Sequence, residues 1–322
     1  MERHQVGLYL AAIVAGAAAG WLAPAAAGAL ERAIAPVLGL LLYATFLGIP
    51  FAALGGAARD LRFLATLLVL NFAVVPVVVF GLTRFLAGDR ALLVGALLVL
   101  LTPCVDYVVV FTGLAGGAAD RLLAASPILM LAQMLLLPAY LWLFAGAEVA
   151  AAIDPGPFVA ALLGLIVLPL VLAALTQLLA RRAQTGAGAR AVAATLQALM
   201  VPLMMATLAV VVGSQIVGVG RGPASLLAVV PVYVAFLLVM VPAGLLAART
   251  ARLDVPSTRA LVFGGATRNS LVVLPLALAL PEPLAAAALA VVTQTLVELV
   301  GMVALVRIVP RLAPAAPSAR PA

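Results

Sequence analysis

The sequence predicts an all-α polytopic membrane protein with ten transmembrane helices. Hydrophobic residues make up 66% of its 322 residues and charged residues only 9%, whereas roughly 25% of a soluble domain is charged. The apolar residues fall into ten windows, each near the roughly 20 residues that one bilayer crossing needs. The two halves of the chain also share a weak internal similarity. We therefore expect membrane spans to fill most of the chain, with no sizeable soluble domain.

In chain order, the ten predicted spans are Val6–Trp21, Ala35–Ala52, Leu61–Phe85, Ala91–Leu114, Leu122–Phe144, Pro157–Leu179, Ala191–Val217, Ser225–Leu246, Thr258–Leu280 and Pro283–Val306. The first span follows Arg3 and has features of a secretory signal. We expect it to be retained, because the internal repeat gives it a counterpart in the sixth span.

The basic residues, all arginines, predict the orientation. With ten spans both termini share one side, and that side collects Arg3, Arg59, Arg62, Arg121, Arg181, Arg182, Arg190, Arg249, Arg252, Arg259, Arg307, Arg311 and Arg320. The other side has only Arg32, Arg84, Arg90 and Arg221. Because cytoplasmic loops carry the excess of basic residues, we expect both termini in the cytoplasm and the chain in the cell membrane. The net charge of +7 follows from the same bias, so we expect no nucleic-acid partner.

An internal repeat predicts two inverted halves. The matching features are Leu40–Pro50 with Pro202–Val212, Val75-Pro76 with Val241-Pro242, and Gln133 in the fifth span with Gln294 in the tenth. Because five spans, an odd number, separate the copies, the halves have opposite orientations in the membrane. We expect one five-helix repeat over residues 1–150, a second over 151–311 and a disordered Pro/Ala-rich tail over 312–322.

Two spans are interrupted by polar residues, in corresponding places of the two halves. The ninth span contains Thr267, Arg268, Asn269 and Ser270, and the fourth contains Pro103, Cys104 and Asp106. Proline breaks a helix and leaves free carbonyls. Unwound backbone at membrane depth is tolerated around a cavity, so interrupted helices indicate a carrier's binding site. We therefore expect helices 4 and 9 to be broken and to cross there.

The charged residues at these breaks allow two interpretations. Arg268 offers five donors in a planar fork, suited to a carboxylate or another oxyanion. Asp106 is a candidate substrate or proton site. The structural alternative is an ion pair between Asp106 and Arg268 that ties the crossing helices together.

The neutral residues at the breaks are equally open. Thr267, Asn269 and Ser270 can bind a hydroxylated solute or an ion, or can satisfy the broken backbone. Cys104 is either packing or a thiol for soft, thiophilic species. As the only cysteine, it excludes an intramolecular disulfide and a multi-cysteine metal site.

A second group of polar residues lies on the fifth and tenth spans. Gln294 and Glu298 are one helical turn apart and share a face, and with Gln133 they are candidates for ion coupling. Glu298 is either a proton carrier or an interfacial acid paired with a loop arginine.

The TPCVDYVVVFTGLAGG segment from Thr102 and the ATRNSLVVLPLALA segment from Ala266 resemble the crossover helices of the bile acid/sodium symporter superfamily. Within it, they are most similar to the arsenical-resistance, arsenite-efflux carriers. The resemblance covers nearly the whole chain and implies ten helices in two inverted repeats, divided into a panel domain and a core domain. It also implies that Cys104, after Pro103, takes part in arsenite transport, and that Glu298 matches the acid of the last helix. The ninth-helix glutamate of these relatives is missing here, and Arg268 stands where arsenite carriers are uncharged.

We therefore expect a secondary transporter without cofactor that exports arsenite or antimonite in exchange for protons, with Cys104 as the ligand of As(III) or Sb(III). The alternative is a small organic anion whose carboxylate binds Arg268. Because Arg268 would repel sodium, we expect sodium-independent transport. An intramembrane aspartyl protease lacks its paired-aspartate motifs here, and an ATP-driven pump lacks its phosphate-binding loop. A channel is disfavoured by the inverted repeat with broken helices.

Overall fold

The computed structural model describes residues 5–48, 60–105, 107–146, 156, 159–160, 162–182, 186–221 and 223–314. All regular elements in these ranges are helical, and the one pairing of extended backbone is an isolated bridge. The prediction of an all-α protein is therefore confirmed for the described part of the chain. Asp106 lies outside the described residues, as does the tail from residue 315.

The first half of the chain forms helices α1 (Gln5–Leu22), α2 (Ala27–Leu47), α4 (Leu61–Val69), α5 (Val75–Thr83), α6 (Arg90–Leu100), α7 (Tyr107–Leu114) and α8 (Ala119–Ala145). A π-helical stretch, η4 (Leu70–Val74), joins α4 to α5. Short 3₁₀ turns are present at η2 (Pro24–Ala26) and η5 (Arg84–Leu86).

The second half forms α11 (Leu168–Ala180), α12 (Gly186–Ala198), α13 (Met200–Arg221), α14 (Pro223–Thr250), α15 (Val255–Ala266), α16 (Ser270–Leu278) and α17 (Ala286–Leu312). The π-helical stretch η6 (Leu162–Val167) precedes α11, and the 3₁₀ turn η7 (Glu282–Leu284) precedes α17. Each of the ten predicted spans overlaps at least one of these helices.

Six of the described helices are long and apolar enough to cross a membrane, and a seventh is obtained if α12 and the first part of α13, bent by 54°, count as one span. Large apolar side chains also cover the outer surface, for example Val77 at 73% exposure and Leu135 at 79%. A soluble monomer rarely exposes so much apolar surface. The chain is therefore a multi-pass membrane protein.

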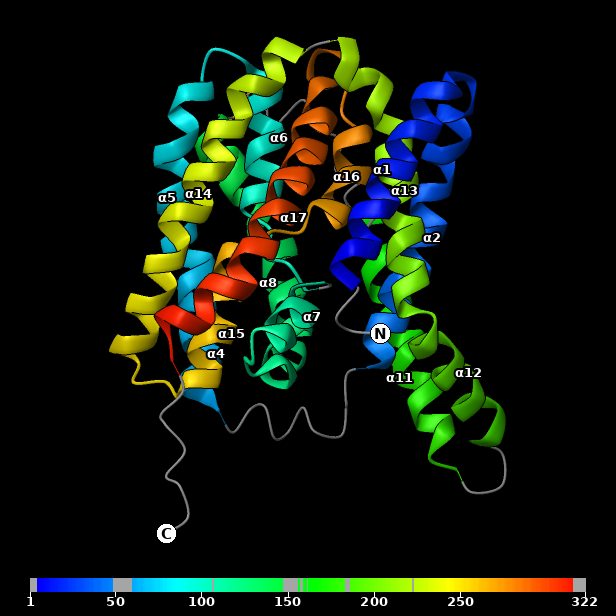
Figure 1. Ribbon diagram of the computed structural model, residues 1–322, viewed down its shortest axis with the longest axis vertical. Coiled ribbons are helices and arrows are strands. Elements are labelled where there is room, and N and C mark those ends of the chain that lie inside the picture. The colour runs from blue at the N-terminus through cyan, green and yellow to red at the C-terminus, as the bar shows by residue number, and fades with distance from the viewer. Residues whose placement is uncertain are drawn as a thin grey trace.

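The helices form two groups, which lie side by side in Figure 1. α1, α2, α11, α12 and α13 pack on one another in one group. α4 to α8 and α14 to α17 form the other, larger group. The groups meet where α16 contacts α2 and where α13 contacts α17.

The interrupted helices form the centre of the larger group. Every residue from 260 to 274 is buried, and so is nearly the whole of α6. A helical segment that is buried on all sides must be apolar all round, which explains why α6 after Arg90 and the second half of α15, from Ala260, carry no polar side chains. The breaks in these helices therefore lie in the best-packed part of the molecule.

The packing of α6 on α17 depends on one glycine. A Cβ atom on Gly95 would lie 2.5 Å from the carbonyl oxygen of Ala287. We predict that Gly95→Ala lowers the melting temperature of the purified protein, because overpacking typically costs about 1–3 kcal/mol. The control is Gly81→Ala in α5, where no atom lies within 4 Å of the added carbon. That variant should match or exceed the wild type, since alanine favours a helix by about 0.5–1 kcal/mol; equal losses in both variants would contradict the prediction.

Candidate functional site

The two interrupted helices meet where each is broken. Residues 101–106 separate α6 from α7, and residues 267–269 separate α15 from α16. The two extended segments are antiparallel, with Pro103 bridged to Arg268. This bridge agrees with the expectation that the breaks in the fourth and ninth spans lie together. We call this place the crossing.

Hydrogen bonds between the two segments hold the crossing together. The Asn269 amide donates to the Thr102 carbonyl at 2.8 Å, and the Cys104 amide donates to the Thr267 carbonyl at 3.3 Å. Pro103, between these two bonds, has no amide hydrogen to satisfy. Each segment therefore provides hydrogen-bond partners for backbone groups of the other segment. Without them these groups would be unpaired inside the membrane.

The Arg268 guanidinium is completely buried and is surrounded by neutral oxygen atoms. Its donor contacts are from Nη2 to Asn71 Oδ1 at 2.8 Å, to the Gly265 carbonyl at 2.7 Å and to the Gly264 carbonyl at 3.2 Å, and from Nη1 to the Leu100 carbonyl at 3.3 Å. We call these four oxygens the oxygen cage.

The oxygen cage explains how a cation is accommodated at this depth. Three of its oxygens belong to the last turns of α6 and α15, where carbonyls lack helical partners and the helix dipole is negative. The Phe236 ring adds a cation–π contact, with its centroid 5.3 Å from the guanidinium carbon. Among the described side chains no carboxylate forms a salt bridge with this guanidinium. The predicted pair with Asp106 involves a residue outside the described ranges.

Glu298, on α17, fastens both broken helices. It accepts hydrogen bonds from the Tyr107 hydroxyl at 2.6 Å and from the Arg268 backbone amide at 2.7 Å. The Gln294 side-chain amide also donates to it, as expected from their shared helix face. Glu298 is only 1% exposed, so its interpretation as an interfacial acid paired with a loop arginine is wrong.

Three of the predicted solute-binding side chains have structural partners. The Thr267 hydroxyl donates to the Phe263 carbonyl at 2.8 Å, Asn269 Oδ1 caps α16 by accepting the Val272 amide at 3.1 Å, and the Thr295 hydroxyl donates to the Ser270 hydroxyl at 2.7 Å. These contacts fit the interpretation in which polar residues satisfy a broken backbone.

Other polar atoms near the crossing keep unused hydrogen-bonding capacity. Within the described part of the chain, Arg268 Nε, Asn269 Nδ2 and Gln294 Oε1 are buried without a hydrogen-bond partner, and so are both side-chain polar atoms of Gln133 on α8. Leaving a buried polar atom unpaired costs about 1–3 kcal/mol, and a ligand that bonds to these atoms would remove that cost. Cys104 is also completely buried, and its backbone amide bonds to the carbonyl of Thr267, the residue before Arg268. A solute can therefore reach Cys104 only after a rearrangement of the helices.

Two residues of the site were missed in the sequence. Asn71 is a single amide in an otherwise apolar span, and that isolation was the available signal. Tyr107 directly follows the first break, but a tyrosine in an apolar run gives no such signal. Both belong to the first half of the chain and bond to charged side chains of the second half, Asn71 to Arg268 and Tyr107 to Glu298.

A family model described as the sodium bile acid symporter family matches residues 35–221, more than half of the chain. The matched range contains Cys104 and the first broken helix. Arg268 and Glu298 lie beyond it. None of the curated proteins matches the chain.

We predict that Tyr107→Phe destabilises the protein by about 1.5–3 kcal/mol, because it removes a hydrogen bond to the buried Glu298 carboxylate. Thermal unfolding in detergent measures the loss. Tyr43→Phe, which removes a bond to the Thr176 hydroxyl, serves as the control and should cost about 0.5–1.5 kcal/mol. In a Glu298→Gln background the effect of Tyr107→Phe should shrink; an unchanged effect would show that the two groups do not interact.

Proposed function

Because the chain belongs to the sodium bile acid symporter family, we propose that it is a secondary transporter that exports arsenite or antimonite in exchange for protons. The family indicates a membrane transporter of small molecules. The observation that supports this substrate is the position of Cys104, the only cysteine, in the extended segment that pairs with the segment from Thr267 to Asn269 at the crossing.

We propose that ten spans form two inverted five-helix repeats, residues 1–150 and 151–311. Several features support this architecture. A helix is present in each predicted span, and the two interrupted helices occupy equivalent places in the two halves. Both termini would then lie in the cytoplasm, as the arginine distribution favours.

The unused polar atoms support a neutral hydroxylated solute. At neutral pH trivalent arsenic exists mainly as an uncharged trihydroxide. Its hydroxyl groups can accept from Asn269 Nδ2 and donate to Gln294 Oε1, both of which are unpartnered. The Cys104 sulfur can displace one hydroxide from arsenic, with the thiol proton leaving as water. A single sulfur ligand holds the metalloid weakly enough for release.

The oxygen cage supports coupling without sodium. Four oxygens around one cation resemble the ligand set of a sodium ion, and the guanidinium already fills the position. A sodium ion about 4 Å away would be repelled by roughly 4 kcal/mol at an effective dielectric constant of 20. This corresponds to about three decades in affinity. In this proposal Arg268 replaces a coupling cation and Glu298 or Asp106 carries the proton.

We predict that Cys104→Ser abolishes arsenite resistance in a host that lacks its own arsenite pumps, because a hydroxyl binds arsenic far more weakly than a thiolate does. Growth in arsenite and the amount of folded protein in the membrane are measured together. The matched control is Cys104→Ser with Ser214→Cys, which moves the thiol to a buried position in α13. It should not restore resistance. Full resistance of the single variant would contradict the proposal.

The second candidate is export or uptake of a small organic anion, which the unpartnered Nε of Arg268 favours. This function predicts normal transport by Cys104→Ser and a KM for the carboxylate that rises about tenfold to a hundredfold in Arg268→Lys, since lysine lacks the planar fork. Arg259→Lys is the control. Arg259 also donates to backbone carbonyls, those of Ala115 and Ala313, but neither carbonyl belongs to the crossing. Uptake of a labelled carboxylate into proteoliposomes measures KM. An unchanged KM in Arg268→Lys would exclude this candidate.

A further inference from the structure

A charged cavity lies where the first turns of α4, α8 and α15 meet, on the face predicted to be cytoplasmic. Its volume is about 460 Å³. Its lining residues are Asp60, Leu61, Arg62, Arg121, Arg252, Leu253 and Asp254. We call it the arginine cavity. Nothing in the proposed transport cycle uses it.

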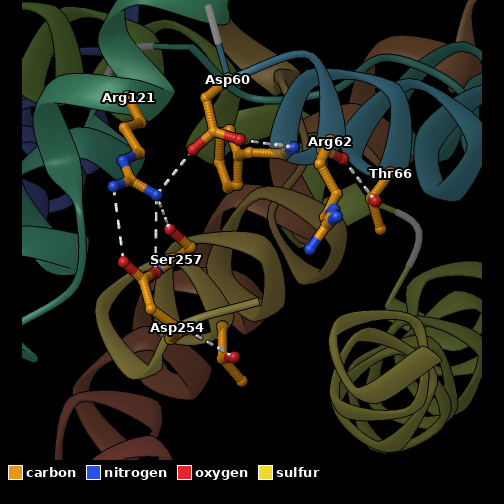
Figure 2. Close-up of polar contacts among 8 residues, drawn as sticks. Asp60, Arg62, Thr66, Arg121, Asp254 and Ser257 are labelled. Carbon is orange, nitrogen blue, oxygen red and sulfur yellow. Dashed lines mark hydrogen bonds and ion pairs between the residues drawn. The ribbon is translucent and has the colours of Figure 1, made fainter. Parts of the chain in front are cut away.

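Arg121 forms ion pairs with both carboxylates of the arginine cavity. Its Nη1 lies 2.7 Å from Asp60 Oδ2, and its Nη2 lies 3.4 Å from Asp254 Oδ2 (Figure 2). Each aspartate also caps a helix, Asp60 through the Phe63 amide and Asp254 through the Ser257 amide. The hydrogen bonds from the Ser257 side chain and backbone amide, followed by the attraction of Arg121, hold the pKa of Asp254 below its ordinary value. Both aspartates therefore already have an ion-pair partner and a backbone amide as hydrogen-bond donor.

The arginine cavity is lined by two further arginines, Arg62 and Arg252. Arg62 lies beside this network in Figure 2, and its guanidinium makes none of the contacts drawn there. Neither Arg62 nor Arg252 forms a salt bridge within the described part of the chain. The three arginines outnumber the two aspartates by one, and three helix N-termini add partial positive charge. The cavity is therefore electrostatically suited to an anion.

The backbone at Arg252 adds a second argument. Arg252 has φ of 51°, in the left-handed region that usually selects glycine after a helix. The Leu253 amide bonds to the Ala248 carbonyl, as in a glycine-type helix end. An arginine there is less favourable than glycine, because its Cβ lies close to the following carbonyl oxygen. The strain is understandable if the guanidinium has a ligand.

We propose that the arginine cavity binds the phosphate of an anionic phospholipid from the cytoplasmic leaflet, through Arg62 and Arg252. A lipid fits better than a soluble anion because Leu61, at the rim, is 66% exposed. An exposed leucine beside an arginine matches the boundary between acyl chains and headgroups. Each arginine near an anionic membrane surface contributes about 1 kcal/mol, or roughly fivefold in affinity.

The test uses the full-length protein in uncharged detergent micelles, with its melting temperature measured against added phosphatidylglycerol. Binding to the folded state raises the melting temperature. We expect a saturable rise that phosphatidylcholine does not give, and Arg62→Gln and Arg252→Gln should each need about fivefold more lipid.

Arg249→Gln is the matched control, since it removes the same charge from the end of α14 without lining the cavity. It should follow the wild type. The proposal is overturned if Arg62→Gln and Arg252→Gln also follow the wild type. It is equally overturned if inorganic phosphate gives the same saturable rise and the two variants abolish it, because the ligand would then be a soluble phosphate.

Discussion

The burial of the Arg268 guanidinium among the ends of two half-helices is the interaction on which the rest of the structure depends. A cation at this depth costs from about 2.5 to over 10 kcal/mol unless it is compensated. The compensation comes from Asn71 and from carbonyls of Leu100, Gly264 and Gly265. Those carbonyls exist as free acceptors only because both helices are broken. The breaks and the arginine therefore require each other.

The opposite charge follows the same rule. Glu298 accepts the amide of Arg268 and the hydroxyl of Tyr107, next to the first turns of α16 and α7, where the helix dipole is positive. The crossing thus separates its charges, with the guanidinium at helix C-termini and the carboxylate near helix N-termini. Neutralising Glu298 by a proton would weaken its hold on both broken helices at once. This gives protonation a direct mechanical route to the crossing, because the acid bridges α7, α17 and the segment between α15 and α16.

Much of this could be predicted from the sequence. The polar residues at 103–106 and 267–270 located both breaks, and the apolar windows located helices that the structure contains. The spacing of Gln294 and Glu298 predicted their contact. The partners of Arg268 could not be predicted, because a guanidinium can bind any oxygen within reach and the sequence does not show which helices are neighbours. For the same reason Glu298 was wrongly given an interfacial alternative: its partner is a backbone amide, which leaves no mark in the sequence. Ten inverted spans, the solute and the coupling ion stay predictions.

The central claim is that Arg268 occupies the position of a coupling cation. The most direct measurement is solute flux in proteoliposomes, with sodium or choline as the only cation varied at fixed pH, and then with a pH gradient imposed in choline. We predict equal flux in sodium and choline, and faster flux when the gradient is imposed. A flux that rises steeply with sodium at fixed pH would contradict this prediction. It would show that a sodium ion binds although the guanidinium fills the oxygen cage.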